Sequence, residues 1–149
     1  MDLSGRIAGV VSTTTFDDLS EETVLASKMA ILDTIGVMIA GSGAGEGVGD
    51  VVGLLEDLGG AERCSVIGFG KKSNPVLAAM ANGALAHSID YDDAHDDAFV
   101  HPSASVVPAA LTVGEFANAS GRDLIRAVSL GNDVMCRLGF AVSNPEENG

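Results

Sequence analysis

Apolar residues recur every three or four positions along most of this chain, which is the spacing of amphipathic helices. Of the 149 residues, 46% are hydrophobic, but only five are Phe, one is Tyr and none is Trp. A core without many large rings must be built from Ala, Val, Leu, Ile and Met, and such a core favours closely packed helices. The sequence therefore predicts an all-α fold, a helical bundle around a single core.

The predicted helices begin and end at recognisable signals. Ser20 is suited to cap a helix because its hydroxyl can accept a backbone N–H, and Asn74 or Ser73 precedes Pro75 in the same way. The stretch 64–69 favours a short strand, so at most one short β element is expected. Residues 1–142 form the predicted helical domain and residues 143–149 a polar tail. The expected helices cover residues 3–11, 21–40, 50–58, 75–89, 103–119 and 121–140.

A glycine-rich run at residues 41–49 separates the second and third expected helices. Its glycines alternate with other residues and never give the GxGxxG spacing of a dinucleotide-binding turn. A helix also precedes the run, where a nucleotide-binding loop requires a strand. We therefore expect a flexible connection rather than a phosphate-binding loop.

The net charge of −13 excludes several classes of partner. No basic face is available to neutralise the phosphates of a nucleic acid or of an anionic membrane. The low Lys content is also typical of salt-adapted proteins, although ordinary acidic solubility explains it equally well. The most apolar stretch, residues 29–40, is too short to span a bilayer, and no signal peptide is evident, so a cytoplasmic protein is expected. Cys64 and Cys136 belong to no CxxC motif and are expected to be buried, reduced thiols.

Residues 90–101 carry the densest chemistry in the chain. Five Asp and two His occupy these twelve positions between two predicted helices. Three interpretations compete for this segment. In the first, imidazoles and carboxylates transfer protons to and from a substrate. In the second, two His and nearby Asp bind Zn²⁺ or Mn²⁺, or carboxylates alone bind Mg²⁺ or Ca²⁺, although no established ligand spacing is met. In the third, the charges are a solvated surface that caps the neighbouring helices.

The residues around this segment resemble the MmgE/PrpD family. The resemblance rests on Asn82-Gly83, on His87-Ser88-Ile89-Asp90-Tyr91-Asp92-Asp93 and on His101-Pro102-Ser103-Ala104. Further matches lie at residues 32–36, 107–111, 120–124 and 131–139, so the resemblance covers about residues 6–140. An ordered series of this length is far more specific than any single motif within it.

The resemblance implies a largely helical domain of a cofactor-independent lyase that binds no metal and acts on tricarboxylic acids. The family includes 2-methylcitrate dehydratase and cis-aconitate decarboxylase, and its members are usually dimers. By position, Asp90 and His101 correspond to the family's active-site Asp and His, and His95 lies in the same segment. Asp93 and Ser103 are expected to contact the substrate, since Ser103 begins a helix whose N–H groups can bind a carboxylate.

The sequence departs from the family pattern in three respects. Ala94 stands where the family usually has Thr, and Asn132-Asp133 replaces an aromatic-acidic pair. The family's members are also considerably longer and close the site with a second domain that supplies basic residues. We therefore expect the N-terminal part of a 2-methylcitrate dehydratase-like lyase that is inactive alone. Its partner would be a second copy or a separately encoded C-terminal portion, and the alternatives are a cis-aconitate decarboxylase-like lyase or a non-catalytic helical dimerisation module.

Overall fold

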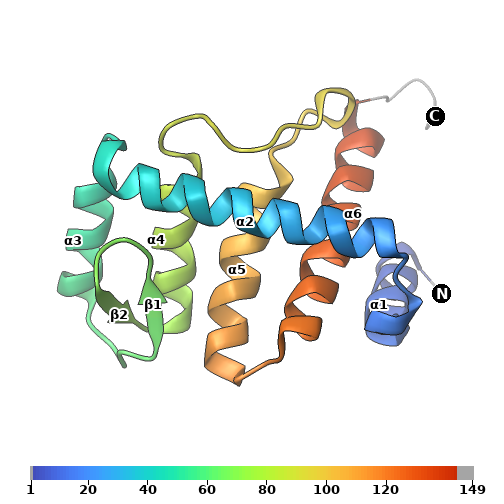
Figure 1. Cartoon of the computed structure of the whole chain (residues 1–149), viewed down its shortest axis with the longest axis horizontal. Coiled ribbons are helices and arrows are strands. Elements are labelled where there is room, and N and C mark those ends of the chain that lie inside the picture. Colours follow the sequence, from blue (N-terminus) through green and yellow to red (C-terminus); the bar gives the residue numbers. More distant parts are fainter. Residues whose placement is uncertain (1, 144–149) are drawn as a thin grey trace.

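Six α-helices and one β-hairpin make up the part of the chain that the computed structural model describes, residues 2–143 (Figure 1). The predicted all-α class with one short β element is confirmed. The last six residues of the predicted polar tail lie outside the described residues. In chain order, the elements are α1 (Leu3–Thr13), η1 (Phe16–Asp18), α2 (Glu21–Ala44), α3 (Val48–Leu58), β1 (Cys64–Val66), β2 (Lys71–Ser73), α4 (Pro75–His87), η2 (Asp96–Ala98), α5 (Pro102–Ala117) and α6 (Gly121–Ser143).

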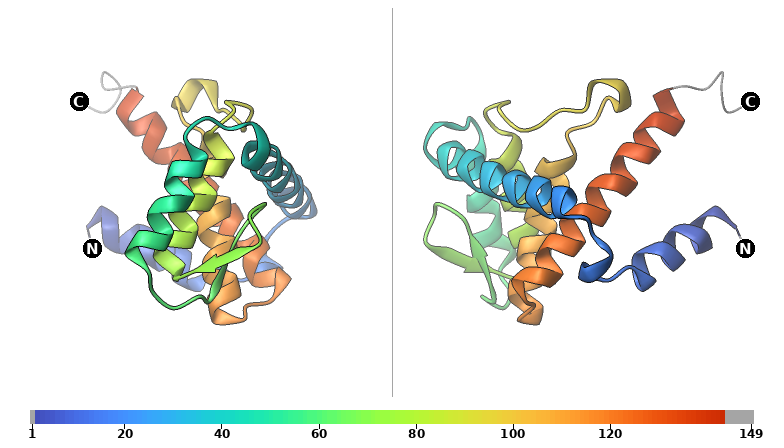
Figure 2. Two further views of the ribbon diagram at one scale, coloured as in Figure 1. Left: turned by 90° about the vertical axis from the view of Figure 1, so that its left-hand side faces the viewer. Right: turned by 45° about the vertical axis from the view of Figure 1, so that its right-hand side comes forward.

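Helix α2 lies across α4, α5 and α6, which stand side by side behind it (Figure 1). Helix α3 and the hairpin cover the far side of α4, and α1 projects away from the bundle without burying any residue (Figure 2). Met38, Leu85 and Val107 are among the largest fully buried side chains, and they come from three different helices. Alanines on α4 complete this packing, because small side chains let neighbouring helices approach closely: Ala78, Ala81 and Ala86.

The predicted capping residues are confirmed at two helix starts. The Ser20 hydroxyl accepts the backbone N–H of Thr23 at 3.1 Å, which satisfies one of the free donors at the start of α2. The side chain of Asn74 accepts the backbone N–H groups of residues 76 and 77, both at 3.1 Å, with Pro75 as the first residue of α4. These contacts define where α2 and α4 begin.

The predicted end of α2 at Ala40 and the predicted flexible connection after it are wrong. The helix continues through the first four residues of the glycine-rich run, and only residues 45–47 separate it from α3. Packing against α4 explains the extension. A Cβ on Gly41 would lie 2.5 Å from the carbonyl oxygen of Leu85 and 2.6 Å from the hydroxyl of Ser88. Glycine here therefore permits a close helix crossing, which outweighs its weak helix propensity.

With 24 residues and a mean hydropathy of 1.6 in its most apolar window, α2 is long and apolar enough to cross a membrane. It is the one helix within residues 2–143 that meets this test, and 28% of that window is buried. Core helices of water-soluble proteins meet the same test. Here α2 packs along one side against α4, α5 and α6, as a helix of the bundle does.

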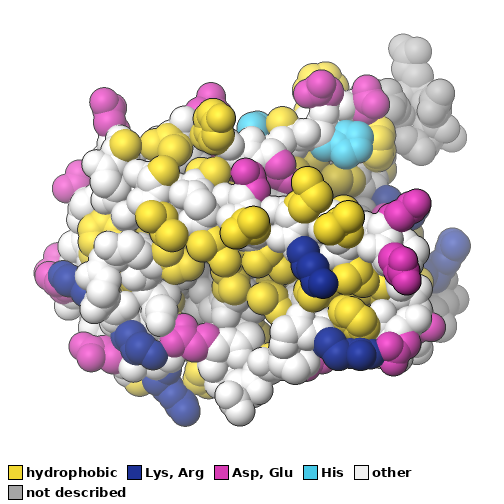
Figure 3. Space-filling model, viewed as in Figure 1, with side chains coloured by type: hydrophobic (Ala, Val, Ile, Leu, Met, Phe, Trp, Pro, Cys, Tyr) yellow, Lys and Arg dark blue, Asp and Glu magenta, His cyan; other side chains and the backbone are white. Residues whose placement is uncertain are grey.

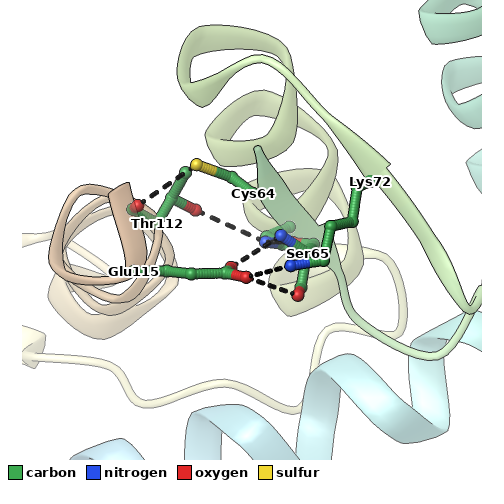
Figure 4. A network of polar contacts seen from close by, with 6 residues as sticks. Cys64, Ser65, Lys72, Thr112 and Glu115 are labelled. Atoms are coloured by element: carbon green, nitrogen blue, oxygen red, sulfur yellow. Dashed lines mark hydrogen bonds and ion pairs between the residues drawn. The ribbon is translucent and has the colours of Figure 1, made fainter. Parts of the chain in front are cut away.

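The hairpin is joined to α5 by Glu115 (Figure 4). Its carboxylate accepts the backbone N–H of Ser65 at 2.6 Å and the Ser65 hydroxyl at 2.9 Å, and it pairs with Lys72 at 2.8 Å. Beside it, the Cys64 thiol donates to the carbonyl of Thr112 at 3.5 Å. The second strand was not predicted, because Lys71-Lys72-Ser73 has no alternation of apolar residues. Strand β2 depends instead on pairing with β1 and on Lys72 reaching Glu115.

A buried amide joins the same hairpin to α4. Asn82 is 2% exposed; its Oδ1 accepts the N–H of Ile67, and its Nδ2 donates to the carbonyl of Ser65, both at 2.9 Å. The hairpin is thus held by side chains of two helices, and it fixes the spacing between them.

We expect Glu115→Gln to weaken the fold mainly above pH 5. Hydrogen bonding from Lys72, followed by the Ser65 N–H, holds the pKa of Glu115 below its usual range. The folded state therefore binds this proton less readily than the unfolded chain does. The stabilisation is complete above the ordinary glutamate pKa of about 4.3 and is lost as pH falls through the lower folded-state pKa.

Urea unfolding at several pH values measures this effect. Glu115→Gln should lower the free energy of unfolding by about 0.5–1.5 kcal/mol near neutral pH, a modest value because the side chain is partly exposed. The loss should shrink towards about pH 3. Glu62→Gln, at an exposed position of the same hairpin region, serves as the control. Equal losses for Glu115→Gln at neutral and acid pH would contradict the assignment.

Candidate functional site

Residues 90–101, the acidic segment, bridge α4 and α5 and rest on the C-terminal half of α6. Contact with α6 is close because residue 139 is glycine: a Cβ there would lie 2.5 Å from the carbonyl oxygen of Ala98 in η2. His95 and Val100 pair through a backbone hydrogen bond of 2.9 Å, which closes the tip of the segment into a short loop. The segment is therefore held at both ends and at its middle.

A buried carboxylate, Asp92, lies at the centre of the site. Its side chain is 1% exposed, and both of its oxygens lie 3.0 Å from Nδ1 of His87. Nδ1 of His101 lies 3.2 Å from Oδ2 of the same carboxylate but is not aligned for a hydrogen bond, so this buried nitrogen has no hydrogen-bond partner. The two imidazole rings meet edge to face, with centroids 5.1 Å apart.

This arrangement presents two imidazoles from two helices to one surface. His87 is the last residue of α4, and His101 directly precedes α5. Both side chains are about half exposed, while their Nδ1 atoms face Asp92. In each ring Nε2 lies on the side roughly opposite Nδ1. A carboxylate at Nδ1 with Nε2 left free is the arrangement that holds a histidine as a general base or acid.

The two predicted substrate-contacting residues bind each other. The carboxylate of Asp93 accepts the backbone N–H of Ser103 at 3.0 Å and the Ser103 hydroxyl at 2.5 Å, and it thereby caps α5. Asn132 on α6 donates to the same hydroxyl at 3.1 Å. Ser103 is 1% exposed. These contacts occupy the groups that were expected to meet a substrate carboxylate. Asn132, which departs from the family pattern, takes part in this helix cap.

The other three predicted site residues, Asp90, His95 and His101, lie in different surroundings. Asp90 lies in the turn after α4 with a positive φ of 52°, its side chain is exposed, and no hydrogen bond or ion pair to its carboxylate occurs within residues 2–143. His95 packs edge-on against Phe140, with ring centroids 5.1 Å apart. His101 and His95 line the same hollow, whereas Asp90 is not among its lining residues.

This hollow measures about 900 Å³ and lies between the acidic segment and the end of α6. No Lys or Arg lines it among the described residues, and the sequence has none between Lys72 and Arg122. An anionic ligand would therefore meet a negative surface here. The lining residues are Ala94, His95, Asp96, Asp97, Phe99, Val100, His101 and Phe140.

Sequence reasoning missed Asp92 and His87 as site residues. Both belong to the motif that carried the resemblance, but Asp92 is one of five Asp residues in the segment and nothing in its neighbours marks it as the buried one. His87 was assigned to a helix. The spacing of five residues between them, across a helix end, is the signal that connects them.

The two cysteines are free thiols; Cys64 is buried as expected, whereas Cys136 is only half-buried. Burial raises the pKa of both thiols, and nearby carboxylates add to it: Glu115 for Cys64, and Asp93 followed by Asp133 for Cys136. Both thiols are therefore protonated and poorly nucleophilic at neutral pH. Neither belongs to the reacting groups of the site.

A helical domain with an Asp-held pair of histidines is thus the class of structure that this chain forms. The chain matches the MmgE/PrpD N-terminal domain over residues 5–149. It belongs to the MmgE/PrpD family, as the sequence motifs predicted.

Several curated relatives are cis-aconitate decarboxylases. The *Mus musculus* protein is 30% identical over 138 residues, which are 88% of this chain and 28% of the relative. The *Homo sapiens* protein is 30% identical over 127 residues, or 80% of this chain and 26% of the relative. The *Aspergillus terreus* protein is 37% identical over 84 residues, or 53% and 17%. The chain therefore spans less than a third of the length of these relatives.

We expect Asp92→Ala to destabilise the domain, because it removes the hydrogen-bond acceptor of Nδ1 of His87 and the carboxylate beside Nδ1 of His101. The loss in free energy of unfolding should be about 1–3 kcal/mol, measured by urea denaturation. Asp96→Ala removes an exposed carboxylate from the same segment and should change stability by less than about 0.5 kcal/mol. Equal effects of the two substitutions would show that Asp92 does not hold the site together.

Proposed function

We propose that this chain supplies the acid–base groups of a lyase that acts on a tricarboxylic acid. One observation carries the proposal: the buried Asp92 carboxylate faces Nδ1 of both His87 and His101 beside an open hollow. His101 is the principal acid–base group because it lines that hollow. Asp92 is a positioning residue, and His87 supplies a second ring that can exchange a proton with the first.

cis-Aconitate is the substrate that the family relationship favours, because the curated relatives described above bear its name. Loss of CO₂ from such an acid leaves an electron pair on carbon, and a general acid must deliver a proton to complete the reaction. The imidazolium form of His101 would donate that proton from Nε2. Asp92 would stabilise the charged ring from the opposite side.

Dehydration of 2-methylcitrate needs the same groups in a different order. A base removes a proton from carbon, and an acid protonates the departing hydroxyl, so that water leaves and a double bond forms. Two imidazoles held by one carboxylate suit both roles. We therefore keep this substrate as the second candidate, and the assay below separates the two.

Substrate binding would require cations from outside the described residues. A tricarboxylate meets Asp96 and Asp97 at the hollow and finds no Lys or Arg there, in a chain of net charge −13. Like charges repel unless local cations offset them. We propose that basic groups from a further portion of the enzyme or from a second copy complete the site.

Two assays test this proposal: CO₂ release from cis-aconitate and water loss from 2-methylcitrate. The chain alone should turn over neither acid. Co-expression with the remaining length of the *Mus musculus* relative should produce activity on one of them. His101→Ala should then lower kcat by about 10²–10⁴-fold, the usual contribution of a general acid or base.

Matched variants separate the roles in that assay. Asp97→Asn removes a charge from the same hollow and should not lower kcat, whereas Asp92→Asn should lower kcat more than it changes KM. Asp92→Glu, which keeps the carboxylate, should recover part of the loss. Robust turnover by the chain alone that His101→Ala leaves unchanged would contradict the proposal.

We also propose that two copies of this chain associate through the outer face of α2. This face exposes four large apolar side chains by 56–74% (Leu25, Met29, Leu32 and Ile39). The inner face of the same helix buries Val37 and Met38 together with the small or polar residues Ser27, Thr34 and Gly41. Figure 3 shows apolar side chains gathered across the surface where α2 lies. Such a contiguous apolar face is typical of an interface.

A second copy suits this face because of its spacing. The four residues follow one another in steps of four, three and seven, the spacing of one face in packed helix pairs, and Leu25 and Ile39 lie equally far from Leu32. In an antiparallel pair with its two-fold axis at Leu32, Leu25 would lie opposite Ile39 of the second copy, and Met29 would lie opposite Ile35. A Cβ on Gly36 would meet nothing within 4 Å, so the position next to Ile35 leaves room for the second copy to approach closely. An isologous contact of this kind forms a closed dimer.

Sedimentation at several protein concentrations tests this interface. We expect a dimer for the unmodified chain and a monomer for Leu32→Glu, which places two like charges at the axis. Val76→Glu alters a side chain that is 77% exposed on α4 and should leave the dimer intact. A monomer at every concentration, or binding to lipid vesicles in place of dimerisation, would contradict the proposal.

A further inference from the structure

We propose that His87, Asp92 and His101 form a binding site for one divalent transition-metal ion of the Zn²⁺ class. Two His and Asp were weighed as metal ligands from the sequence, with His95 as one of the pair. The structure replaces His95 by His87, which comes from the end of α4 rather than from the acidic segment. The metal-binding interpretation therefore returns with a different set of ligands.

The distances suit one ion. One donor atom from each of the three residues can be chosen so that all lie within 4.8 Å of one another. The carboxylate lies 3.0 Å from Nδ1 of His87 and 3.2 Å from Nδ1 of His101. Ligands at 2.0–2.1 Å from a tetrahedral Zn²⁺ lie about 3.3 Å apart. A small outward movement of the two half-exposed rings would bring all three donors to bonding distance.

A second observation points to a ligand at this place. Nδ1 of His101 is buried without a hydrogen-bond partner, although it lies beside a carboxylate that is 1% exposed. A buried polar atom without a partner costs free energy, about 1–3 kcal/mol. A cation between the carboxylate and this nitrogen would satisfy both groups. The three donors thus form a preformed site rather than a cluster of surface acids.

The donor set also selects the class of ion. Two imidazole nitrogens and one carboxylate suit Zn²⁺, Co²⁺ or Ni²⁺, whereas Mg²⁺ and Ca²⁺ prefer oxygen ligands. The four other Asp residues of the segment add negative charge around the site, and no Lys or Arg occurs between residues 72 and 122 to oppose a cation. The exposed side of the two rings leaves a coordination position for water or a ligand carboxylate.

Metal binding and proton transfer would require different tautomers of the same imidazole rings. A ring that donates a hydrogen bond from Nδ1 to Asp92 keeps its lone pair on Nε2, where it can accept a proton. A ring that binds a metal through Nδ1 carries its proton on Nε2 instead and can no longer act as a base there. The ion would therefore inhibit the acid–base chemistry, a consequence that rests on the proposed function, whereas metal binding itself does not.

Metal binding can be measured without any turnover. The chain is stripped with a chelator and titrated with Zn²⁺ against a chromophoric competitor. We expect one equivalent to bind, and His87→Ala and His101→Ala each to weaken binding at least about 10-fold, the loss that even an outer partner of a metal ligand can cause. His95→Ala is the matched control, because it removes the one other His of the chain and should leave the affinity unchanged.

Nitrogen NMR of the unmodified chain provides a second measurement that does not depend on the variants folding. Zn²⁺ should shift the Nδ1 signals of two histidines and leave the third unchanged. No binding, binding that both His87→Ala and His101→Ala leave intact, or coordination through His95 would each overturn the proposal. Inhibition of the complemented enzyme by Zn²⁺ is measured separately, so absent activity would count against the lyase and not against the metal site.

Discussion

A single buried carboxylate holds the functional end of this domain together. Asp92 is almost fully buried, and a carboxylate in that position requires partners that offset its loss of water. The partners are Nδ1 atoms at the end of α4 and just before α5, so one side chain determines how the two helices are joined. The acidic segment folds around this contact, and η2 then packs against α6. The proposed proton-transfer groups and the proposed metal ligands both follow from the same requirement.

The described residues supply no basic side chain to the rest of the site. The hollow beside His101 has acidic and apolar walls, and the cap formed by Asp93 and Ser103 is directed into the protein. The proposed acid–base groups lie beside this hollow, but its lining offers a tricarboxylate no favourable charge. The proposed association through α2 and the need for added cations therefore address separate requirements: the first covers an apolar face, and the second completes an active site.

Most of the fold could be predicted from the sequence, because apolar spacing and capping residues act locally. Ser20 and Asn74 marked helix starts correctly, and the scarcity of aromatic residues favoured helices. The errors arose where tertiary contacts determine the bounds or the existence of an element. The end of α2 depends on Gly41 meeting Leu85, and β2 depends on its pairing with β1. For the same reason the motif directed attention to residues 90–101 but could not distinguish the buried Asp92 from its four neighbouring Asp residues.

The contacts of Asn82 and Glu115 have a consequence for aggregation. A two-stranded sheet normally leaves open edges, whose free N–H and C=O groups can pair with strands of other molecules. On the outer edge of β1, the N–H and carbonyl of Ser65 are already bound by Glu115 and Asn82, and Asn82 also binds the N–H of Ile67. These side chains occupy the places of a third strand. The β1 edge of the hairpin is thereby closed to intermolecular β-pairing.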